Sequence, residues 1–216
     1  MPEVAVIDYG LGNLLSVRRG LEHCGATVAV TSDPDIILSA PRVILPGVGA
    51  FAHGMTELRN RGLDQIVRKV ATQGGALLGI CLGMQMLLDE SEEFGKTEGL
   101  GIIPGRVAPI PPKTLKGDSQ KIPHIGWNNL VLSQGLENGE GVLLKEINLR
   151  EAVYFVHSFM AVPSNPKHCI ANCLYGGISI PAIIGRGNIF GCQFHPEKSG
   201  TIGLKILRRF LSLCKL

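Results

Sequence analysis

One of the six cysteines in the 216-residue chain stands in a pattern that favours nucleophilic chemistry. The segment Gly79-Ile80-Cys81-Leu82-Gly83 places a nucleophile between two glycines, which is typical of a sharp turn from a strand into a helix. Such a turn exposes the Cys81 thiol, and the helix that follows directs backbone N–H groups and a positive dipole end at the sulfur. The N–H of Leu82 is then also placed to bind an oxyanion. A buried structural cysteine is equally compatible with this motif alone.

A nucleophilic thiol needs a base, and the segment FGCQFHPEKS supplies a candidate. His195 and Glu197 are separated by one proline, and side chains two positions apart in an extended segment lie on the same face. A carboxylate in that place can orient an imidazole, while the intervening proline stiffens the spacing by fixing its own backbone angle. An ordinary surface turn can have the same sequence, so this motif is also ambiguous by itself.

A third segment, ILPGVGAF at residues 44–51, passes from a β-rich run into a Pro-Gly-x-Gly loop. Glycines allow a loop to bring backbone N–H groups close to a ligand. The amides around Val48 and Gly49 are therefore candidates for a second oxyanion donor. A simple turn after a strand would explain the same sequence.

The elements that must position these residues alternate regularly between strands and helices in the first half of the chain. Short β-rich runs alternate with helical patterns, namely VAVID, LLSVRRGLEHCG, TVAVT, DPDIILSA, RVILPG, the long HGMTELRNRGLDQIVRKVATQGG, and ALLGI. This order predicts βαβ units around a parallel sheet whose two faces are covered by helices. Active sites of such sheets lie at the carboxyl ends of the strands.

The sequence pattern changes from about Pro104 onward. A proline-rich stretch is followed by β-rich segments, which predict hairpins and an antiparallel part of the sheet. The last segment places Ile202, Ile206, Phe210 and Leu213 on one helical face, so we expect it to pack back onto the sheet. The two halves then share one core, and we expect a single α/β domain over residues 1–216.

Composition argues against several classes of protein. The formal net charge is only +3 and the basic residues are scattered, which does not indicate a nucleic-acid or membrane partner. The start of the chain has no signal-peptide pattern, and no apolar run reaches membrane-spanning length without breaks, so we expect a cytoplasmic protein with free thiols. His168, Cys169 and Cys173 lack a second pair of metal ligands, and we interpret these cysteines as structural.

The order PGVGAF, GICLGMQ and FHPEKS on an α/β chain strongly resembles the class I glutamine amidotransferases. The resemblance implies a catalytic triad of Cys81, His195 and Glu197. It also assigns Gln85 to contact with the substrate and the loop at Val48 and Gly49 to the oxyanion site. The fold implied is one amidotransferase domain with a central mixed, mostly parallel sheet flanked by helices and antiparallel strands in the second half.

Further segments are similar to the glutaminase subunits of imidazole glycerol phosphate synthases, namely IDYGLGNLLSV, HIGWN, YFVHSF and QFHPEKS. Other branches of the class typically have two glycines where this chain has Pro46-Gly47. By this resemblance His157 and Ser158 lie near the substrate, although polar residues at the end of a buried strand would look the same. Residues 109–121 match no motif, and we assign them no role.

The chemistry implied by the resemblance is hydrolysis of L-glutamine to glutamate and ammonia through a thioester, without a metal or another cofactor. The family passes the ammonia to a cyclase subunit, a separate (β/α)8 barrel that forms imidazole glycerol phosphate and an aminoimidazole carboxamide ribonucleotide in histidine biosynthesis. We therefore expect a heterodimer. Its contact surface should include Asn13, in the glycine-containing loop after the first strand, and Lys198, although that loop could simply be a turn capping a helix.

Other functions remain compatible with parts of the pattern. A paralogous amidotransferase that feeds another synthase, for example in surface-sugar biosynthesis, would have the same catalytic motifs. A cysteine peptidase or related hydrolase would use the same turn at the nucleophile, but it does not explain PGVGAF or Gln85. A non-enzymatic binding subunit does not explain the complete set of candidate catalytic residues.

Overall fold

The first half of the chain forms the predicted alternation of strands and helices. The structure is a computed structural model that describes residues 2–133, 142–145, 147 and 151–213. The elements of this half are β1 (Val4–Ile7), α1 (Leu14–His23), β2 (Val28–Thr31), α2 (Pro34–Ser39), β3 (Arg42–Leu45), α3 (Phe51–Asn60), α4 (Leu63–Thr72), β4 (Ala76–Ile80) and α5 (Leu82–Met86).

The long helical pattern over residues 53–75 is divided into two helices. Gly62 has a φ of 66°, in the left-handed region, and separates α3 from α4. A glycine takes up this conformation without the steric cost that other residues incur. The helical spacing of apolar residues continues on both sides of the break, and for that reason the sequence pattern looks uninterrupted.

The second half is mostly β-structure, with a final helix. Its strands are β5 (Glu90–Ser91), β6 (Thr97–Glu98), β7 (Gly105–Pro109), β8 (His124–Asn129), β9 (Val131–Leu132), β10 (Ala152–His157), β11 (Phe159–Pro163), β12 (Cys169–Tyr175), β13 (Ile178–Arg186) and β14 (Ile189–Cys192). Three short 3₁₀ turns, η1 (Val142–Leu144), η2 (Pro166–His168) and η3 (Pro196–Lys198), and the helix α6 (Gly200–Leu211) complete the described elements.

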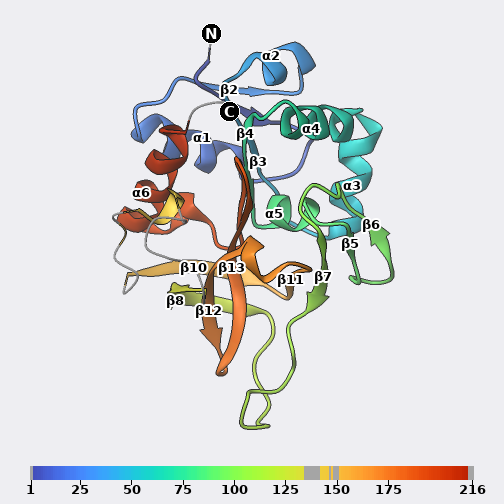
Figure 1. The fold of residues 1–216 in the computed structure, drawn as a ribbon, viewed down its shortest axis with the longest axis vertical. Coiled ribbons are helices and arrows are strands. Elements are labelled where there is room, and N and C mark those ends of the chain that lie inside the picture. The colour runs from blue at the N-terminus through green and yellow to red at the C-terminus, as the bar shows by residue number, and fades with distance from the viewer. Residues whose placement is uncertain (1, 134–141, 146, 148–150, 214–216) are drawn as a thin grey trace.

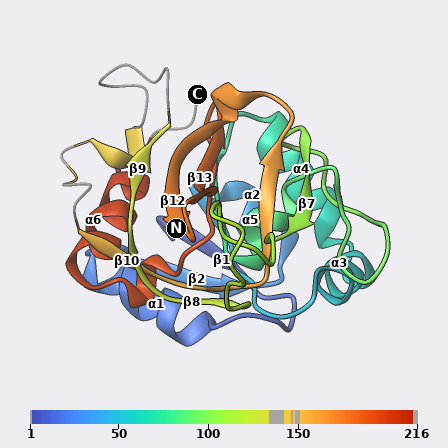
Figure 2. The same cartoon turned by 90° about the horizontal axis from the view of Figure 1, so that it is seen from below.

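The main sheet has the order β2-β1-β3-β4-β14-β13-β12-β9. Neighbouring strands from β2 to β14 are parallel, and those from β14 to β9 are antiparallel. This mixed sheet, with its antiparallel part in the second half of the chain, confirms the predicted fold. Two smaller sheets pair β8 with β10, which lie side by side in Figure 2, and join β11, β7, β5 and β6.

Helices cover both faces of the parallel strands. In Figure 1, α1 and α6 lie on one side of β3 and β4, and α3 and α4 lie on the other. Alternate strand residues point to opposite faces of the sheet, so the buried side chains form two clusters. One cluster contains Val4, Val6 and Ile44, packed against α1 and α6. The other contains Ala5, Ile7 and Leu45, packed against α2, α3 and α4.

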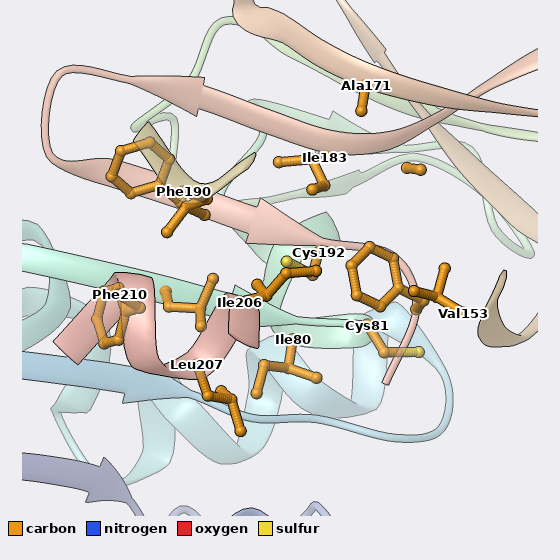
Figure 3. Close-up of a cluster of buried hydrophobic side chains, with 14 of the residues drawn as sticks. Ile80, Cys81, Val153, Ala171, Ile183, Phe190, Cys192, Ile206, Leu207 and Phe210 are labelled. Atoms are coloured by element: carbon orange, nitrogen blue, oxygen red, sulfur yellow. The ribbon is translucent and has the colours of Figure 1, made fainter. Parts of the chain in front are cut away.

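The final helix packs as its sequence pattern predicts. Ile202, Ile206 and Phe210 of α6, together with Leu213 beyond it, are buried in the cluster that Figure 3 shows in part. Because the apolar face of α6 contacts the sheet formed by the first half of the chain, the two halves share one core. Among the described residues, no helix has the length and apolar character needed to cross a bilayer.

Candidate active site

Cys81 occupies a strained turn between β4 and α5. Its backbone has φ 54° and ψ −109°, a conformation that costs free energy for a residue with a side chain. The flanking glycines are required by close contacts. A Cβ at Gly79 would lie 2.6 Å from the carbonyl oxygen of Gly83, and a Cβ at Gly83 would overlap the carbonyl oxygen of Leu45. The predicted strand-to-helix turn around the cysteine is therefore present.

The turn holds the Cys81 side chain at the carboxyl end of the sheet. Cys81 is 8% exposed and lies beside Ile80 and Cys192 at one end of the cluster in Figure 3. Its N–H donates to the carbonyl oxygen of Cys192 at 2.7 Å, which fixes the turn to β14. Leu82 is the first residue of α5, so its N–H has no acceptor within that helix and can bind another group.

His195 reaches the same edge of the sheet from the neighbouring strand. β14 pairs with β4 in parallel, with Cys192 opposite Ile80, so the residues that follow both strands emerge together. The His195 Nδ1 atom lies 2.8 Å from Oε1 of Glu197, and both side chains are almost completely buried. The Cys81 thiol lies close enough to the His195 ring to help raise the pKa of that ring. The three predicted catalytic side chains therefore form one continuous chain of contacts.

Ser199 fixes the backbone of His195, a function that sequence reasoning did not identify. The Ser199 hydroxyl donates to the His195 carbonyl oxygen at 2.6 Å and accepts from the N–H of Tyr154 at 3.0 Å. The N–H of His195 in turn donates to the carbonyl oxygen of Tyr154 at 3.1 Å. A serine two residues after the predicted His-x-Glu pair was the available signal, but these contacts depend on β10, which is distant in sequence.

The electrostatic environment of His195 favours the protonated ring. Burial by itself lowers the pKa of His195, but hydrogen bonds to Cys81 and Glu197 and the attraction of both groups outweigh it and raise the pKa to about 9. An imidazolium held between a carboxylate and a sulfur stabilises a thiolate and can later donate its proton to a leaving group.

The raised pKa of His195 has a measurable pH dependence. We expect an NMR titration of the His195 ring to have its midpoint near pH 9, and Glu197→Gln to lower that midpoint because one stabilising partner loses its charge. The folded-state pKa lies above the unfolded value of about 6.5, so the stabilisation is complete below pH 6.5 and is lost as the pH rises through about 9.

The control for this titration is His195→Gln, which identifies the signal by removing it. Urea unfolding of wild type and Glu197→Gln between pH 6 and 10 measures how much the protonation of His195 contributes to the free energy of unfolding. A midpoint below 6.5 that Glu197→Gln leaves unchanged would contradict the hydrogen-bond chain.

The predicted oxyanion loop approaches the nucleophile closely. A Cβ at Gly47 would lie 2.6 Å from the Tyr9 hydroxyl and 3.0 Å from the N–H nitrogen of Gly83. Tyr9 donates to the carbonyl oxygen of Pro46 at 2.8 Å. Burial, with a further contribution from Cys81, raises the pKa of Tyr9 well above its usual range, so the hydroxyl remains a donor. Sequence reasoning missed Tyr9 because the contact joins the loop after β1 to a loop 37 residues away.

Beyond that loop lies a cavity of about 260 Å³ that brings the predicted substrate residues together. Gly49, Gln85, His157 and Ser158 all line it, and Val48, beside Gly49, is 40% exposed. The cavity also contains Glu93, which sequence reasoning did not identify. The Glu93 carboxylate accepts the N–H of Phe51 at 2.6 Å and so caps α3. The remaining lining residues are Pro123, Val156 and Phe159.

Gln85 is oriented by a second glutamine that connects it to Cys81. The Gln85 amide nitrogen donates to the carbonyl oxygen of Phe159 at 3.1 Å and to Oε1 of Gln193 at 3.0 Å. The Gln193 amide nitrogen lies 3.8 Å from the Cys81 sulfur. With both nitrogen contacts made, the Gln85 carbonyl oxygen remains able to accept a hydrogen bond from a ligand. Gln193 is another residue that the sequence alone did not single out.

A chain of buried imidazoles adjoins the same carbonyl group of Phe159. His157 Nδ1 lies 2.9 Å from this oxygen, His157 Nε2 lies 2.9 Å from His124 Nδ1, and His124 Nε2 lies 2.7 Å from the Asn128 amide nitrogen. A carbonyl oxygen can only accept, so each ring is protonated at Nδ1 and accepts at Nε2. Burial lowers the pKa of both rings to about 4, which keeps them neutral at physiological pH.

The two predicted interface residues lie at the same end of the molecule as Cys81. Asn13 precedes α1 and its side chain makes no capping hydrogen bond, so it is available to another partner. Its loop contacts the predicted oxyanion loop, since a Cβ at Gly12 would lie 3.3 Å from Cβ of Pro46. Lys198 is exposed in η3, directly after Glu197.

The other cysteines have different surroundings. Burial raises the pKa of Cys173 to about 12, and the Cys169 thiol donates to Asn172 at 3.2 Å. Among the described residues, no three His, Cys, Asp or Glu side chains form a group that could hold a metal ion. Cys214 lies outside the described residues.

The sequence profile of the family "Glutamine amidotransferase class-I" matches residues 5–213. The chain belongs to this family. Its solved structural neighbours carry the same fold: a glutamine amidotransferase crystal structure has a TM-score of 0.69 and PurLQS from Thermotoga maritima one of 0.67, each at 19% identity and with 97% of both chains covered.

Within the class I glutamine amidotransferases, three similar curated relatives are named as HisH subunits. An "Imidazole glycerol phosphate synthase subunit HisH 1" of Legionella pneumophila strain Lens is 50% identical over 99% of this chain and 100% of its own length. Subunits named HisH from Geobacillus sp. strain WCH70 and Methanosarcina acetivorans are each 45% identical, covering 97% and 99% of this chain and 96% and 100% of their own lengths.

Proposed function

We propose that this amidotransferase is the glutaminase subunit of an imidazole glycerol phosphate synthase. It hydrolyses L-glutamine to L-glutamate and ammonia, and the ammonia passes to a cyclase subunit. The observation that carries the catalytic assignment is the chain of contacts from Cys81 through His195 to Glu197 beside the cavity of Gln85. The HisH relatives, at 45–50% identity over nearly the whole chain, support the histidine pathway over another synthase as the recipient.

The proposed reaction begins with attack of the Cys81 thiolate on the side-chain amide carbon of glutamine. A carbon–sulfur bond forms, and the carbonyl oxygen becomes an oxyanion that accepts hydrogen bonds from the N–H of Leu82 and from the loop amide at Val48 or Gly49. Protonated His195 donates its proton to the amide nitrogen as the carbon–nitrogen bond breaks and ammonia leaves.

A water molecule completes the cycle. Neutral His195 removes a proton from this water, which attacks the thioester carbon through a second oxyanion at the same donors. Glutamate leaves and the Cys81–His195 ion pair is restored. Glu197 orients the ring through Nδ1 and stabilises its charged form, so it acts on the reaction through His195.

The cavity residues support recognition of the amino-acid end of glutamine. Glu93 is a carboxylate that lines the cavity, and a carboxylate favours a positively charged α-ammonium group. Gln85 offers its carbonyl oxygen as an acceptor, because its amide nitrogen is engaged by Phe159 and Gln193. Ser158 supplies a further hydroxyl at the wall of the cavity.

The exposed apolar residues near the active site suit a protein partner. Ile125 and Trp127 lie on one face of β8 and are 55% and 56% exposed. Trp127 packs against Tyr154, with ring centroids 5.8 Å apart, and the Tyr154 backbone holds His195. Exposed aromatic and aliphatic anchors beside polar groups are typical of protein interfaces. We assign this surface, with Asn13 and Lys198, to the cyclase subunit.

The test is glutamine turnover by the chain alone and with the cyclase and its nucleotide ligand. We expect the cyclase to stimulate turnover, and Asn13→Ala and Lys198→Ala each to raise the cyclase concentration needed for half-maximal stimulation roughly three- to tenfold. Lys167→Ala is the matched control, because Lys167 is an exposed lysine in η2 rather than beside the triad.

Thermal unfolding of the three variants shows whether the fold is intact, as expected for surface changes. Full turnover by the lone chain, with no further increase on adding the cyclase, would contradict the proposed dependence on a partner. Equal stimulation of Lys198→Ala and wild type would remove Lys198 from the interface.

A further inference from the structure

We propose that a second cavity, at the opposite edge of the main sheet from Cys81, binds a small phosphate monoester that carries an apolar group. The cavity has a volume of about 520 Å³, within the range of small-molecule sites. Its polar lining includes Arg68, Arg186 and Asn188, and its apolar lining includes Leu100, Ile102 and Ile189.

The position of this cavity separates it from Cys81 and from the cavity lined by Gln85. Gly74 and Asn188 line it, and they precede β4 and β14 at the amino ends of these strands. Cys81 and His195 follow the carboxyl ends of the same two strands. The five residues of β4 span about 16 Å, at roughly 3.3 Å per residue. A ligand in this cavity therefore does not compete directly with glutamine.

Two guanidinium groups face the cavity without a carboxylate partner within ion-pair distance among the described residues. Arg68 donates to the carbonyl oxygens of Gly99 and Leu100, and Arg186 donates to the carbonyl oxygen of Ile102 at 3.2 Å. These acceptors are neutral, so the contacts do not place either guanidinium in a direct ion pair. Asp89 is near, because a Cβ at Gly101 would lie 3.5 Å from its Oδ1, but Asp89 makes no ion pair with either arginine.

The geometry of the two arginines suits a phosphate group. Both are tied to the same four-residue segment, 99–102, so their side chains converge on one part of the cavity. Each guanidinium has five N–H donors, and most remain unused after these contacts. Phosphate oxygens pair with arginine through two parallel hydrogen bonds, and a dianion can neutralise both side chains. The neighbouring isoleucines and leucine favour an apolar body on the ester.

The same segment connects the cavity to the nucleophile helix. The N–H groups of Leu100, Gly101 and Ile102 donate to the carbonyl oxygens of Met86, Leu88 and Leu87, which end or follow α5. α5 has five residues and begins directly after Cys81, and it carries Gln85. Redirecting the two arginines toward a ligand alters the support of segment 99–102 and thereby of α5. The site is thus placed to change glutamine turnover, an effect that rests on the proposed function, whereas binding itself does not.

Phenyl phosphate is the probe for a direct test by isothermal titration calorimetry on the full chain. We expect one site, and about tenfold weaker binding or more for Arg186→Gln, because a charge-assisted bidentate pair is lost. Arg19→Gln, an exposed arginine of α1, is the matched control and should bind as wild type does. Binding should persist after a glutamine-analogue electrophile has modified Cys81, which excludes the catalytic cavity.

Two further ligands separate the chemical classes. Phenol tests the apolar group without charge, and benzoate replaces the phosphate by a carboxylate; both should bind at least about tenfold more weakly than phenyl phosphate. Equal binding of phenol would reduce the site to an apolar cavity, and equal binding of benzoate would overturn the choice of phosphate. No binding of phenyl phosphate, or equal binding by Arg186→Gln with an unchanged thermal midpoint, would refute the site itself.

Glutamine turnover in the presence of the cyclase, measured with saturating phenyl phosphate, then tests the connection to α5. We expect turnover to change at least about twofold in wild type and Arg19→Gln, and to remain unchanged in Arg186→Gln. Binding without any change in turnover would remove the proposed link to α5 while leaving the site. If the chain hydrolysed no glutamine even with the cyclase present, the proposed function would fail, and the calorimetric result would still decide on the phosphate site independently.

Discussion

Cys81→Ala is expected to lower glutamine hydrolysis by at least about 1000-fold, because removal of a nucleophile that acts as a unit with its base eliminates the covalent pathway. The side chain is small and lies at the end of the core, so the fold should be retained. Turnover with the cyclase present and thermal unfolding of the same preparations measure the two effects separately.

Cys24→Ala is the matched control for this prediction. Cys24 is half-buried in a different part of the chain and its thiol donates to the carbonyl oxygen of Leu204 at 3.5 Å, away from the catalytic residues. We expect activity close to wild type. Cys192 is a poorer control, since it is fully buried and its own carbonyl oxygen accepts the N–H of Cys81. Labelling of another cysteine ahead of Cys81 by a glutamine-analogue electrophile would contradict the assignment.

His195→Ala is expected to have an effect close to that of Cys81→Ala, because the general acid for ammonia release and the base for water are then both lost. The double variant should be scarcely slower than either single variant, since the two groups act together. Measurement of kcat in the cyclase complex tests this. A double variant slower than both by the product of the single effects would show that the two side chains act independently.

Glu197→Gln provides the comparison within the triad. The imidazole remains, so we expect this variant to be at least roughly tenfold more active than His195→Ala. In the described structure Oε2 of Glu197 is buried without a hydrogen-bond partner, so the amide N–H₂ of a glutamine has no acceptor in that place. An unsatisfied buried donor costs about 1–3 kcal/mol, and unfolding measurements must accompany the kinetics. Wild-type-like rates for both variants would exclude the proposed roles.

The main sheet and the local geometry around the candidate catalytic residues were predictable because their signals are local in sequence. Gly79 and Gly83 are required because a side chain at either position would clash within the turn or with the end of β3. His195 and Glu197 are two residues apart, and this short spacing allows the hydrogen bond between their side chains. The alternation of β-rich and helical segments indicated the order of elements in the first half. A glycine with positive φ inside a long helical pattern also has a local signal, yet the uninterrupted apolar spacing around Gly62 concealed it.

The residues that sequence reasoning missed make contacts over long sequence separations. Glu93 caps a helix 42 residues earlier, Gln193 contacts a glutamine 108 residues away, and Ser199 contacts the Tyr154 backbone 45 residues away. No spacing rule connects such positions before the strands are placed. Gln85 was identified only through the family resemblance, because its contacts are also distant in sequence. Periodicity alone describes it as a polar residue on an apolar helix.

Strand β8 presents different residues to its two sides, with a practical consequence for spectroscopy. His124 is buried in the imidazole chain that leads toward Gln85, whereas Trp127 stands on the exposed side and is the only tryptophan of the chain. Indole emission responds to the polarity around the ring, and Trp127 is 56% exposed to water. The protein therefore contains an intrinsic fluorophore at its proposed docking surface, so that association can be followed in real time without a dye or a tag.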